Sequence, residues 1–171
     1  GYIYKGLKPV YWCTDCETAL AEAEIEYKDI NSNTAYVKFP VVDGKGLIQR
    51  DETSVVIWTT TPWTLPGNTL IAVGEDIDYA LVKVGTERLI FAKDLVEQVM
   101  KIAKIEEYEV EQEFKGKALA GIVCKHPFLD RTSTVVTGTE DSVNVELGTG
   151  SGCVHVAPSY GKEDYLLGLK H

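Results

Sequence analysis

Residues 54–68 read SVVIWTTTPWTLPGN and combine the clearest strand of the chain with an abrupt end to it. Residues 54–60 are mostly apolar or β-branched, a pattern typical of a strand that is buried on both faces. Pro62 and Pro66 have no N–H to offer a sheet, and Gly67 followed by Asn68 favours a turn. A threonine run alone is usually strand. Here two prolines and two tryptophans surround four threonines, which predicts a rigid, irregular loop that turns hydroxyls and backbone N–H groups toward a ligand.

Short strands are expected on both sides of that segment. Residues 19–27 alternate apolar residues with three glutamates, which predicts a half-buried strand paired with residues 35–39. Residues 93–103 place their apolar side chains on one helical face, and a second helix is expected after Asp164. The other expected strands are residues 69–73, 79–84, 88–92, 108–114, 134–137, 143–146 and 153–156. The pattern predicts a β-rich α+β fold, a barrel or a sandwich with a few short helices.

Composition and charge narrow the class of protein. The chain has 171 residues, of which 44% are hydrophobic and 25% charged, and this suits one globular domain with its own core. Its apolar runs are far shorter than the about 20 residues of a membrane span, and no signal-peptide core is visible. We therefore expect a cytoplasmic chain with no membrane partner. Seventeen basic against twenty-six acidic residues give a net charge of −9, so the chain alone should bind a nucleic-acid backbone weakly.

Four cysteines are too few for a disulfide scaffold. Cys13 and Cys16 form a CxxC pair, whereas Cys124 and Cys153 lie far apart in the sequence. A structural zinc site needs four ligands, so Cys13 and Cys16 could hold zinc only if a parent protein supplied a second cysteine pair. Free thiols are the simpler interpretation, and we expect neither a metal nor a cofactor in the chemistry of the chain.

A second unusual segment is GTGSGCVHVAPSYGKEDY, residues 148–165. Its glycines are not followed by a lysine and a hydroxyl residue at the spacing of a P-loop, so a nucleotide cradle of that type is excluded. No serine stands in a nucleophile-elbow context near His155, so covalent hydrolysis has no support. A lone histidine on a strand is usually a satisfied core residue, and Asp164 could simply cap the helix that follows it.

Taken together, WTTTPWTLPGN and GSGCVHVAPSYGKEDY, preceded by PVYWCTDCETALAEAEIEY, resemble the editing (connective-peptide) domain of class I isoleucyl-tRNA synthetases. The resemblance runs from Lys8 to the end of the chain. Valyl and leucyl relatives typically carry an arginine where this chain has Thr61, and they lack the Pro62-Trp63-Thr64 sequence. The resemblance implies a single barrel-like editing domain over residues 1–171, with residues 1–20 as the connecting stalk. The nucleotide-binding signatures of the class are missing, so ATP binding would belong to the parent enzyme.

The resemblance also implies an activity, the hydrolysis of mischarged valyl-tRNA(Ile) to valine and tRNA(Ile). Asp164 matches the carboxylate that holds the α-ammonium group, and Thr64 and His155 match positions that contact the amino-acid side chain. The positions implied in catalysis are Thr59, Thr60, Thr61 and Asp164. The positions implied in substrate binding are Trp63, Thr64, Asn68, His155 and Asp164.

These residue types suit the implied reaction. An aminoacyl ester is already activated, so a positioned water and oriented donors can suffice without a metal or a covalent nucleophile. A carboxylate reads the free ammonium through a charge-assisted hydrogen bond. Three positions depart from the family pattern: Ser151, Val156 and Tyr160. We expect these departures to adjust the activity rather than to abolish it.

The implied partners are the 3′ end of tRNA(Ile) carrying valine and the rest of the parent synthetase, with the chain itself monomeric. Two alternatives stay open at this point. One is a non-catalytic module that binds the acceptor end of tRNA, and the other is the editing domain of a valyl or leucyl relative. A metal-ribbon interaction domain built on Cys13 and Cys16 is a third interpretation, which metal analysis would test.

Overall fold

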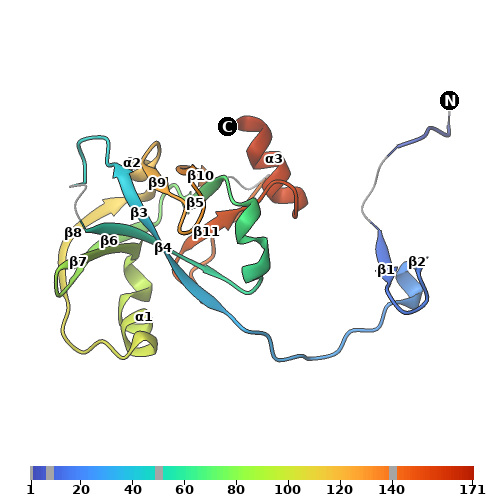
Figure 1. The fold of residues 1–171 in the computed structure, drawn as a ribbon, viewed down its shortest axis with the longest axis horizontal. Helices are drawn as coiled ribbons and strands as arrows, with labels where there is room; N and C mark the ends of the chain where they lie inside the picture. The colour runs from blue at the N-terminus through green and yellow to red at the C-terminus, as the bar shows by residue number, and fades with distance from the viewer. Residues whose placement is uncertain (1, 7–9, 49–51, 139–141) are drawn as a thin grey trace. The chain divides into compact units, whose positions relative to one another are not determined.

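A computed structural model describes residues 2–6, 10–48, 52–138 and 142–171. The chain forms two compact units, Gly1–Ser32 and Asn33–His171 (Figure 1). Lys8 and Pro9, where the resemblance begins, lie outside the described residues. The assignment of all 171 residues to one editing domain, with residues 1–20 as a stalk, stays a prediction.

The first unit is a small hairpin in which β1 (Tyr11–Cys13) pairs antiparallel with β2 (Thr18–Leu20). The strand expected over residues 19–27 was wrong beyond Leu20, because the chain turns there into a short 3-10 helix, η1 (Glu22–Glu24). The carboxylate of Glu24 accepts a hydrogen bond from the backbone N–H of Ala21 at 2.7 Å and favours that turn. The expected pairing with residues 35–39 was also wrong, because β2 has its partner within the hairpin.

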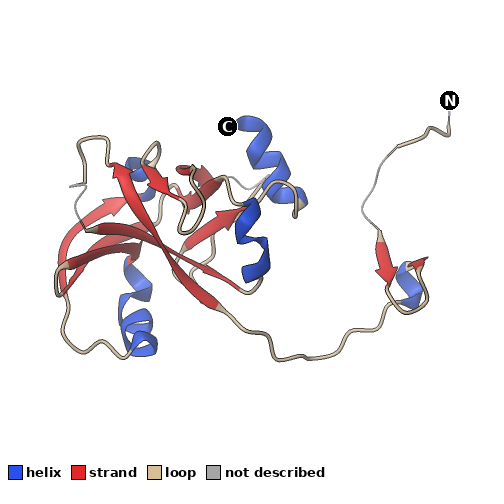
Figure 2. Cartoon of the chain, viewed as in Figure 1, coloured by secondary structure: helices blue, strands red, loops and turns tan. Residues whose placement is uncertain are grey.

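The second unit is built on one nine-stranded sheet (Figure 2). The sheet order is β11-β5-β10-β9-β3-β4-β7-β6-β8, and an additional parallel bridge joins β11 to β4. That bridge closes six strands into a barrel, which confirms the predicted β-rich, barrel-like fold. The strands are β3 (Ala35–Asp43), β4 (Thr53–Thr59), β5 (Leu70–Gly74), β6 (Asp78–Val84), β7 (Glu87–Ala92), β8 (Glu109–Lys115), β9 (Val123–Lys125), β10 (Thr132–Gly138) and β11 (Cys153–Val156).

Strand β4 is the centre of this sheet, as its sequence predicts. It pairs antiparallel with β3 along its length, parallel with β7 at its start, and parallel with β11 where Val154 faces Trp58. Val55 and Ile57 are fully buried in the main apolar core, and Val56 is nearly so. Apolar side chains on both faces therefore hold β4 in place, and the residues that follow it leave the sheet from a rigid base.

The helices are few and short, as expected. Those of the second unit are η2 (Pro62–Gly67), η3 (Lys93–Leu95), α1 (Val96–Ala103), α2 (Gly116–Leu119) and α3 (Lys162–Lys170). The loop predicted after β4 is more regular than expected, because Pro62 starts a 3-10 helix in which Asn68 N–H bonds to the carbonyl of Leu65 at 2.9 Å. In the described part of the chain, no helix is long and apolar enough to cross a membrane.

One expected strand is missing from the described residues, at 143–146. The alternating pattern there has a different cause, since Val143 is buried in a second apolar cluster with Val156 of β11 and Leu167 of α3. Packing on this cluster explains the apolar residue without any ladder of hydrogen bonds. The same cluster fixes α3 against the barrel, which places the start of α3 close to the end of β11.

Candidate functional site

A cavity of about 330 Å³ is lined by the two segments that the sequence singled out, residues 54–68 and residues 148–165. The parallel bridge between Trp58 and Val154 brings the segments together, because each continues past it in the same direction. The lining residues come from the end of β4 and the two residues after it, from η2, from β11, from the turn before α3 and from the start of α3. They are Trp58, Thr59, Thr60, Thr61, Thr64, Val154, His155, Tyr160 and Asp164.

The threonines at this cavity are ordered by hydrogen bonds among themselves. The backbone N–H of Thr61 donates to Oγ1 of Thr59 at 3.0 Å, and the hydroxyls of Thr60 and Thr61 lie 3.4 Å apart. Thr64 closes the turn, because its N–H and its hydroxyl both donate to the carbonyl of Thr61, at 3.1 and 2.8 Å. The hydroxyl of Thr59 accepts in this arrangement and keeps its own proton available to donate.

His155 stands in the wall of the cavity and is 8% exposed. Its Nε2 lies 2.8 Å from Oγ1 of Thr64, and its Nδ1 lies 3.3 Å from Nδ2 of Asn68. Burial lowers the pKa of His155, while the charge of Asp164 raises it and His126 lowers it further. The net direction is downward, so the ring is neutral near pH 7.

Asp164 lies in the first turn of α3 and lines the same cavity. Its Oδ2 accepts a hydrogen bond from the backbone N–H of Ala157 at 2.8 Å, so the carboxylate ties the start of α3 to the residue that follows β11. The simple capping role considered above is not what is observed, because no side chain caps α3. One carboxylate therefore anchors the chain and adds a negative charge to the cavity.

Two of the implied substrate-binding residues lie elsewhere. Asn68 is fully buried and does not line the cavity, but it touches His155 from behind. Trp63 is 69% exposed and does not line the cavity either. The structure thus gathers Thr59, Thr60, Thr61, Thr64, His155 and Asp164, and it places Asn68 beneath them.

A group of side chains that the sequence did not single out supports this loop from below. We call residues 126–133, which comprise the loop after β9 and the first two residues of β10, the support segment. Nε2 of His126 lies 2.9 Å from the carbonyl of Leu65, and the guanidinium of Arg131 donates to the carbonyl of Pro66. Ser133 donates its hydroxyl to Oδ1 of Asn68. Three hydrogen bonds from the support segment therefore hold η2 and the asparagine that follows it. No sequence motif in residues 126–133 predicted these bonds.

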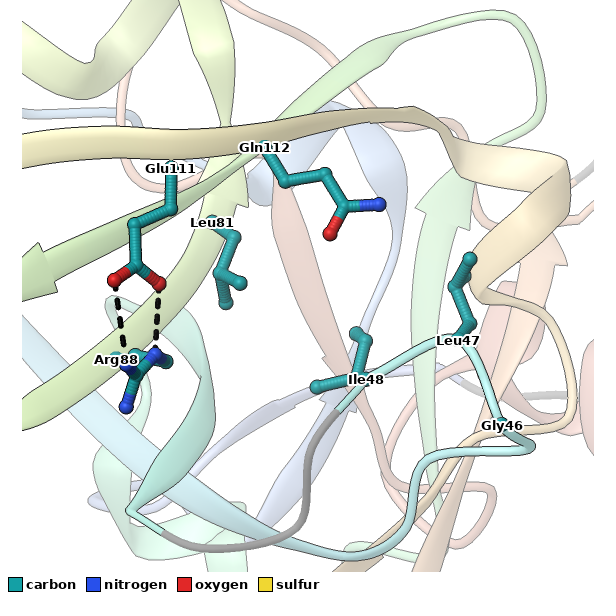
Figure 3. A pocket seen from close by; sticks show the side chains of 7 residues that line it. All are labelled: Gly46, Leu47, Ile48, Leu81, Arg88, Glu111 and Gln112. Atoms are coloured by element: carbon teal, nitrogen blue, oxygen red, sulfur yellow. Dashed lines mark hydrogen bonds and ion pairs between the residues drawn. The ribbon is translucent and has the colours of Figure 1, made fainter.

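Another cavity, of about 440 Å³, has an entirely different lining (Figure 3). Its charged lining groups satisfy each other, because Arg88 donates to both carboxylate oxygens of Glu111, at 2.7 and 3.2 Å. None of the residues implied in catalysis or binding lines it. We therefore place the candidate site at the smaller, threonine-lined cavity.

The CxxC pair lies in the first unit. The backbone N–H of Cys16 donates to Sγ of Cys13 at 3.3 Å, and this bond lowers the pKa of the Cys13 thiol. Within residues 2–6, 10–48, 52–138 and 142–171, no three metal-ligating side chains come together. The zinc interpretation of Cys13 and Cys16 stays a conditional prediction.

Known proteins resemble the chain over nearly its whole length. A family model of class I tRNA synthetases (I, L, M and V) matches residues 1–135. Isoleucine–tRNA ligase of Moorella thermoacetica is 53% identical over 171 residues, which cover all of this chain and 18% of the ligase. Isoleucine–tRNA ligase of Caldicellulosiruptor bescii is 56% identical over 170 residues, which cover 96% of this chain and 18% of the ligase. The chain thus spans about a fifth of the length of these relatives.

Solved structures resemble the fold. The editing domain of P. knowlesi cytosolic leucyl-tRNA synthetase matches with a TM-score of 0.63 and 12% identity, covering 77% of this chain and 60% of that domain. GlLeuRS-CP1 matches with a TM-score of 0.62 and 16% identity, covering 79% and 59%. At these identities the likeness concerns the fold alone, and it agrees with the barrel described above.

Proposed function

Because the chain belongs to the class I tRNA synthetases of the isoleucine, leucine, methionine and valine group, we propose that it is an editing hydrolase. Its substrate is valyl-tRNA(Ile), and its products are valine and tRNA(Ile). The reaction is needed because one methylene separates valine from isoleucine and is worth only about 1–3 kcal/mol of discrimination, for which this pair is the standard example. A second pocket that admits only the smaller ester can remove the error.

The observation that carries the proposal is the composition of one cavity. It presents threonine hydroxyls, a neutral imidazole and a carboxylate within about 330 Å³. Asp164 supplies the charge that binds the α-ammonium of an aminoacyl ester. His155 and Thr64 are held together at 2.8 Å and form a wall that limits the length of the amino-acid side chain. Close-packed side chains resist deformation, so an extra methyl group meets steric resistance there.

The chemical step needs little from the protein beyond positioning. A water oxygen bonds to the ester carbonyl carbon, the bond to the ribose oxygen breaks, and the ribose oxygen takes up a proton. Thr59 already accepts a bond from Thr61 N–H, so its hydroxyl can donate to the water or to the carbonyl oxygen as negative charge develops. Thr60 and Thr61 add hydroxyls at the same edge of the cavity.

One further point supports the isoleucine assignment over a valyl or leucyl relative. The ligases that match at 53% and 56% identity are both isoleucine–tRNA ligases, whereas the leucyl structures match at 12% and 16% and concern the fold. The partners that we propose are the 3′ end of tRNA(Ile) and the remainder of a cytoplasmic ligase, which would bind ATP and supply most of the tRNA affinity. A net charge of −9 agrees with weak binding by the chain alone.

The test is incubation of the chain with valyl-tRNA(Ile) and with isoleucyl-tRNA(Ile), measuring the loss of each ester. We expect hydrolysis of the valyl ester alone, with the same rate in the presence of a chelator. Loss of activity in chelator and recovery with zinc would contradict a metal-free reaction. Binding of tRNA without loss of either ester would favour the alternative, a non-catalytic acceptor-end module.

A further inference from the structure

We propose that Asn68 and Ser133 are positioning residues that hold His155 as a neutral imidazole protonated on Nε2. The inference rests on the proposed function and deepens it. A neutral His155 does not pair with the carboxylate of Asp164, so that carboxylate can bind the ammonium group of the substrate. Neither Asn68 nor Ser133 lines the cavity, and both are fully buried behind it.

The orientation of the Asn68 amide is set by a backbone carbonyl. Nδ2 of Asn68 lies 2.9 Å from the carbonyl oxygen of Leu70, which can only accept a hydrogen bond. The NH₂ group must therefore face that side, and its second proton points to Nδ1 of His155 at 3.3 Å. Oδ1, on the opposite side of the amide, accepts the hydroxyl proton of Ser133. Every polar atom of the buried amide is thereby satisfied, as burial requires.

The orientation of the Asn68 amide determines which nitrogen of the His155 ring carries the proton. Because Nδ1 of His155 faces a donor, it must be the unprotonated nitrogen, and the neutral ring carries its proton on Nε2. That proton points to Oγ1 of Thr64 at 2.8 Å, and the hydroxyl of Thr64 donates its own hydrogen bond to the carbonyl of Thr61. Donors thus run in one direction from Ser133 to Thr61. Protonation of Nδ1 is disfavoured by this series of hydrogen bonds, because the N–H at Nδ1 would then face the NH₂ group of Asn68 and both groups are donors.

The charges around His155 show why this matters for the substrate. Asp164 from α3 and His126 from the support segment are the charged or titratable groups that act on the ring. His126 accepts backbone N–H bonds at Nδ1, from Leu129 at 3.1 Å and from Phe128 at 3.4 Å. An imidazolium at position 155 would attract Asp164 and repel an α-ammonium group. The neutral ring leaves the carboxylate to the substrate.

The test compares substitutions at positions 68 and 133 in the full 171-residue chain. Asn68→Asp replaces the donor that faces Nδ1 with an acceptor, so it should favour a protonated ring. Ser133→Ala leaves Oδ1 of Asn68 without its donor, and Ser133→Cys keeps the shape but offers a much weaker donor. Ser54→Ala on β4 is the control for loss of a serine hydroxyl outside this series.

Two measurements are made on each variant. The ring ¹⁵N chemical shifts of His155 report the tautomer and its titration without requiring activity. The pH dependence of KM and of kcat for valyl-tRNA(Ile) reports the competition for Asp164. In the wild type we expect the Nε2–H tautomer and a KM that rises as pH falls through the pKa of His155. In Asn68→Asp that rise should move to higher pH, with KM increased about tenfold at pH 6 and kcat changed less.

Ser133→Ala and Ser133→Cys should shift the titration in the same direction by less, because the carbonyl of Leu70 still orients the amide. Ser54→Ala should match the wild type. An Nδ1–H tautomer in the wild type overturns the proposal. So does a ring whose titration is unchanged in all three folded variants at positions 68 and 133. Failure of the proposed function would appear separately, as absence of ester loss in a chain whose His155 tautomer is as stated.

Discussion

Asp164→Asn is the most direct perturbation of the proposed site. It removes one negative charge and keeps the shape of the side chain. Asp164 has two tasks in the structure, since its Oδ2 accepts from Ala157 N–H at 2.8 Å while its charge faces the cavity. The amide oxygen of asparagine can keep the bond to Ala157. Its NH₂ group would then face the place of the substrate's α-ammonium, where a donor meets a cation.

The structure sets the size of the expected effect. A hydrogen bond to a charged group is worth about 1.5–3 kcal/mol, which corresponds to a loss of about 10- to 150-fold in kcat/KM. Asp164 is partly exposed, so solvent screening favours the lower part of that range. The loss should fall mainly on KM, because the ammonium is bound equally in the ground state and in the transition state.

The assay measures initial rates of ester loss from valyl-tRNA(Ile), together with urea unfolding of each variant. Asp164→Asn should unfold within about 0.5 kcal/mol of the wild type, whereas Asp164→Ala also loses the bond to Ala157 and should be about 1 kcal/mol less stable. Hydrolysis at the wild-type rate by a folded Asp164→Asn chain would refute the assignment of the ammonium to this carboxylate.

Three other predictions follow from the same structure. His155→Ala shortens the cavity wall and should begin to hydrolyse isoleucyl-tRNA(Ile), so the ratio of the two ester rates should fall; equal slowing of both would place the size limit elsewhere. Tyr79→Phe removes a buried hydroxyl that donates to Gly152 O at 2.6 Å and accepts from Gly74 N at 2.9 Å, and it should lower the free energy of urea unfolding by about 1–3 kcal/mol without changing ester specificity. Iodoacetamide at pH 8 should label two thiols in the native chain and four after denaturation. Burial raises the pKa of the Cys124 thiol to about 12 and also raises the pKa of the Cys153 thiol, so neither reacts until the chain unfolds.

Strands whose side chains fill the core could be predicted from the sequence, and even the four-residue β11 has the expected bounds. Elements set by local turn chemistry or by packing outside the sheet could not. The predictions for β4 and for the hairpin of β6 and β7 are confirmed, because their own side chains fill the core. Residues 19–27 failed because the alternation of alanine and glutamate buries too little to hold a strand, so local turn chemistry decides there. Residues 143–146 failed for the opposite reason, since Val143 is buried by tertiary packing rather than by a sheet.

In the candidate site too, some residues could be predicted from the sequence and others could not. The residues that face the cavity carry chemistry that can be noticed in a sequence, such as His155 on a strand after a glycine-rich turn or Asp164 at the start of a helix. The support segment carries no such signal. Ser133 is one serine in a strand, and its role depends on lying within hydrogen-bond reach of Asn68, 65 positions away. Only the sheet order, in which β10 is the neighbour of β5, brings the two together.

The bridge between β4 and β11 has a consequence for the order of events during protein synthesis. Thr64 and His155, which touch in the finished barrel, are 91 residues apart in the chain. At about 5–20 residues per second, a ribosome needs about 5–20 s to make the chain between them. Until β11 is made, the end of β4 and one edge of β5 lack this strand partner. Closure of the barrel and assembly of the pocket are then one event, so the proposed discrimination between esters would be gained in a single late step rather than by degrees.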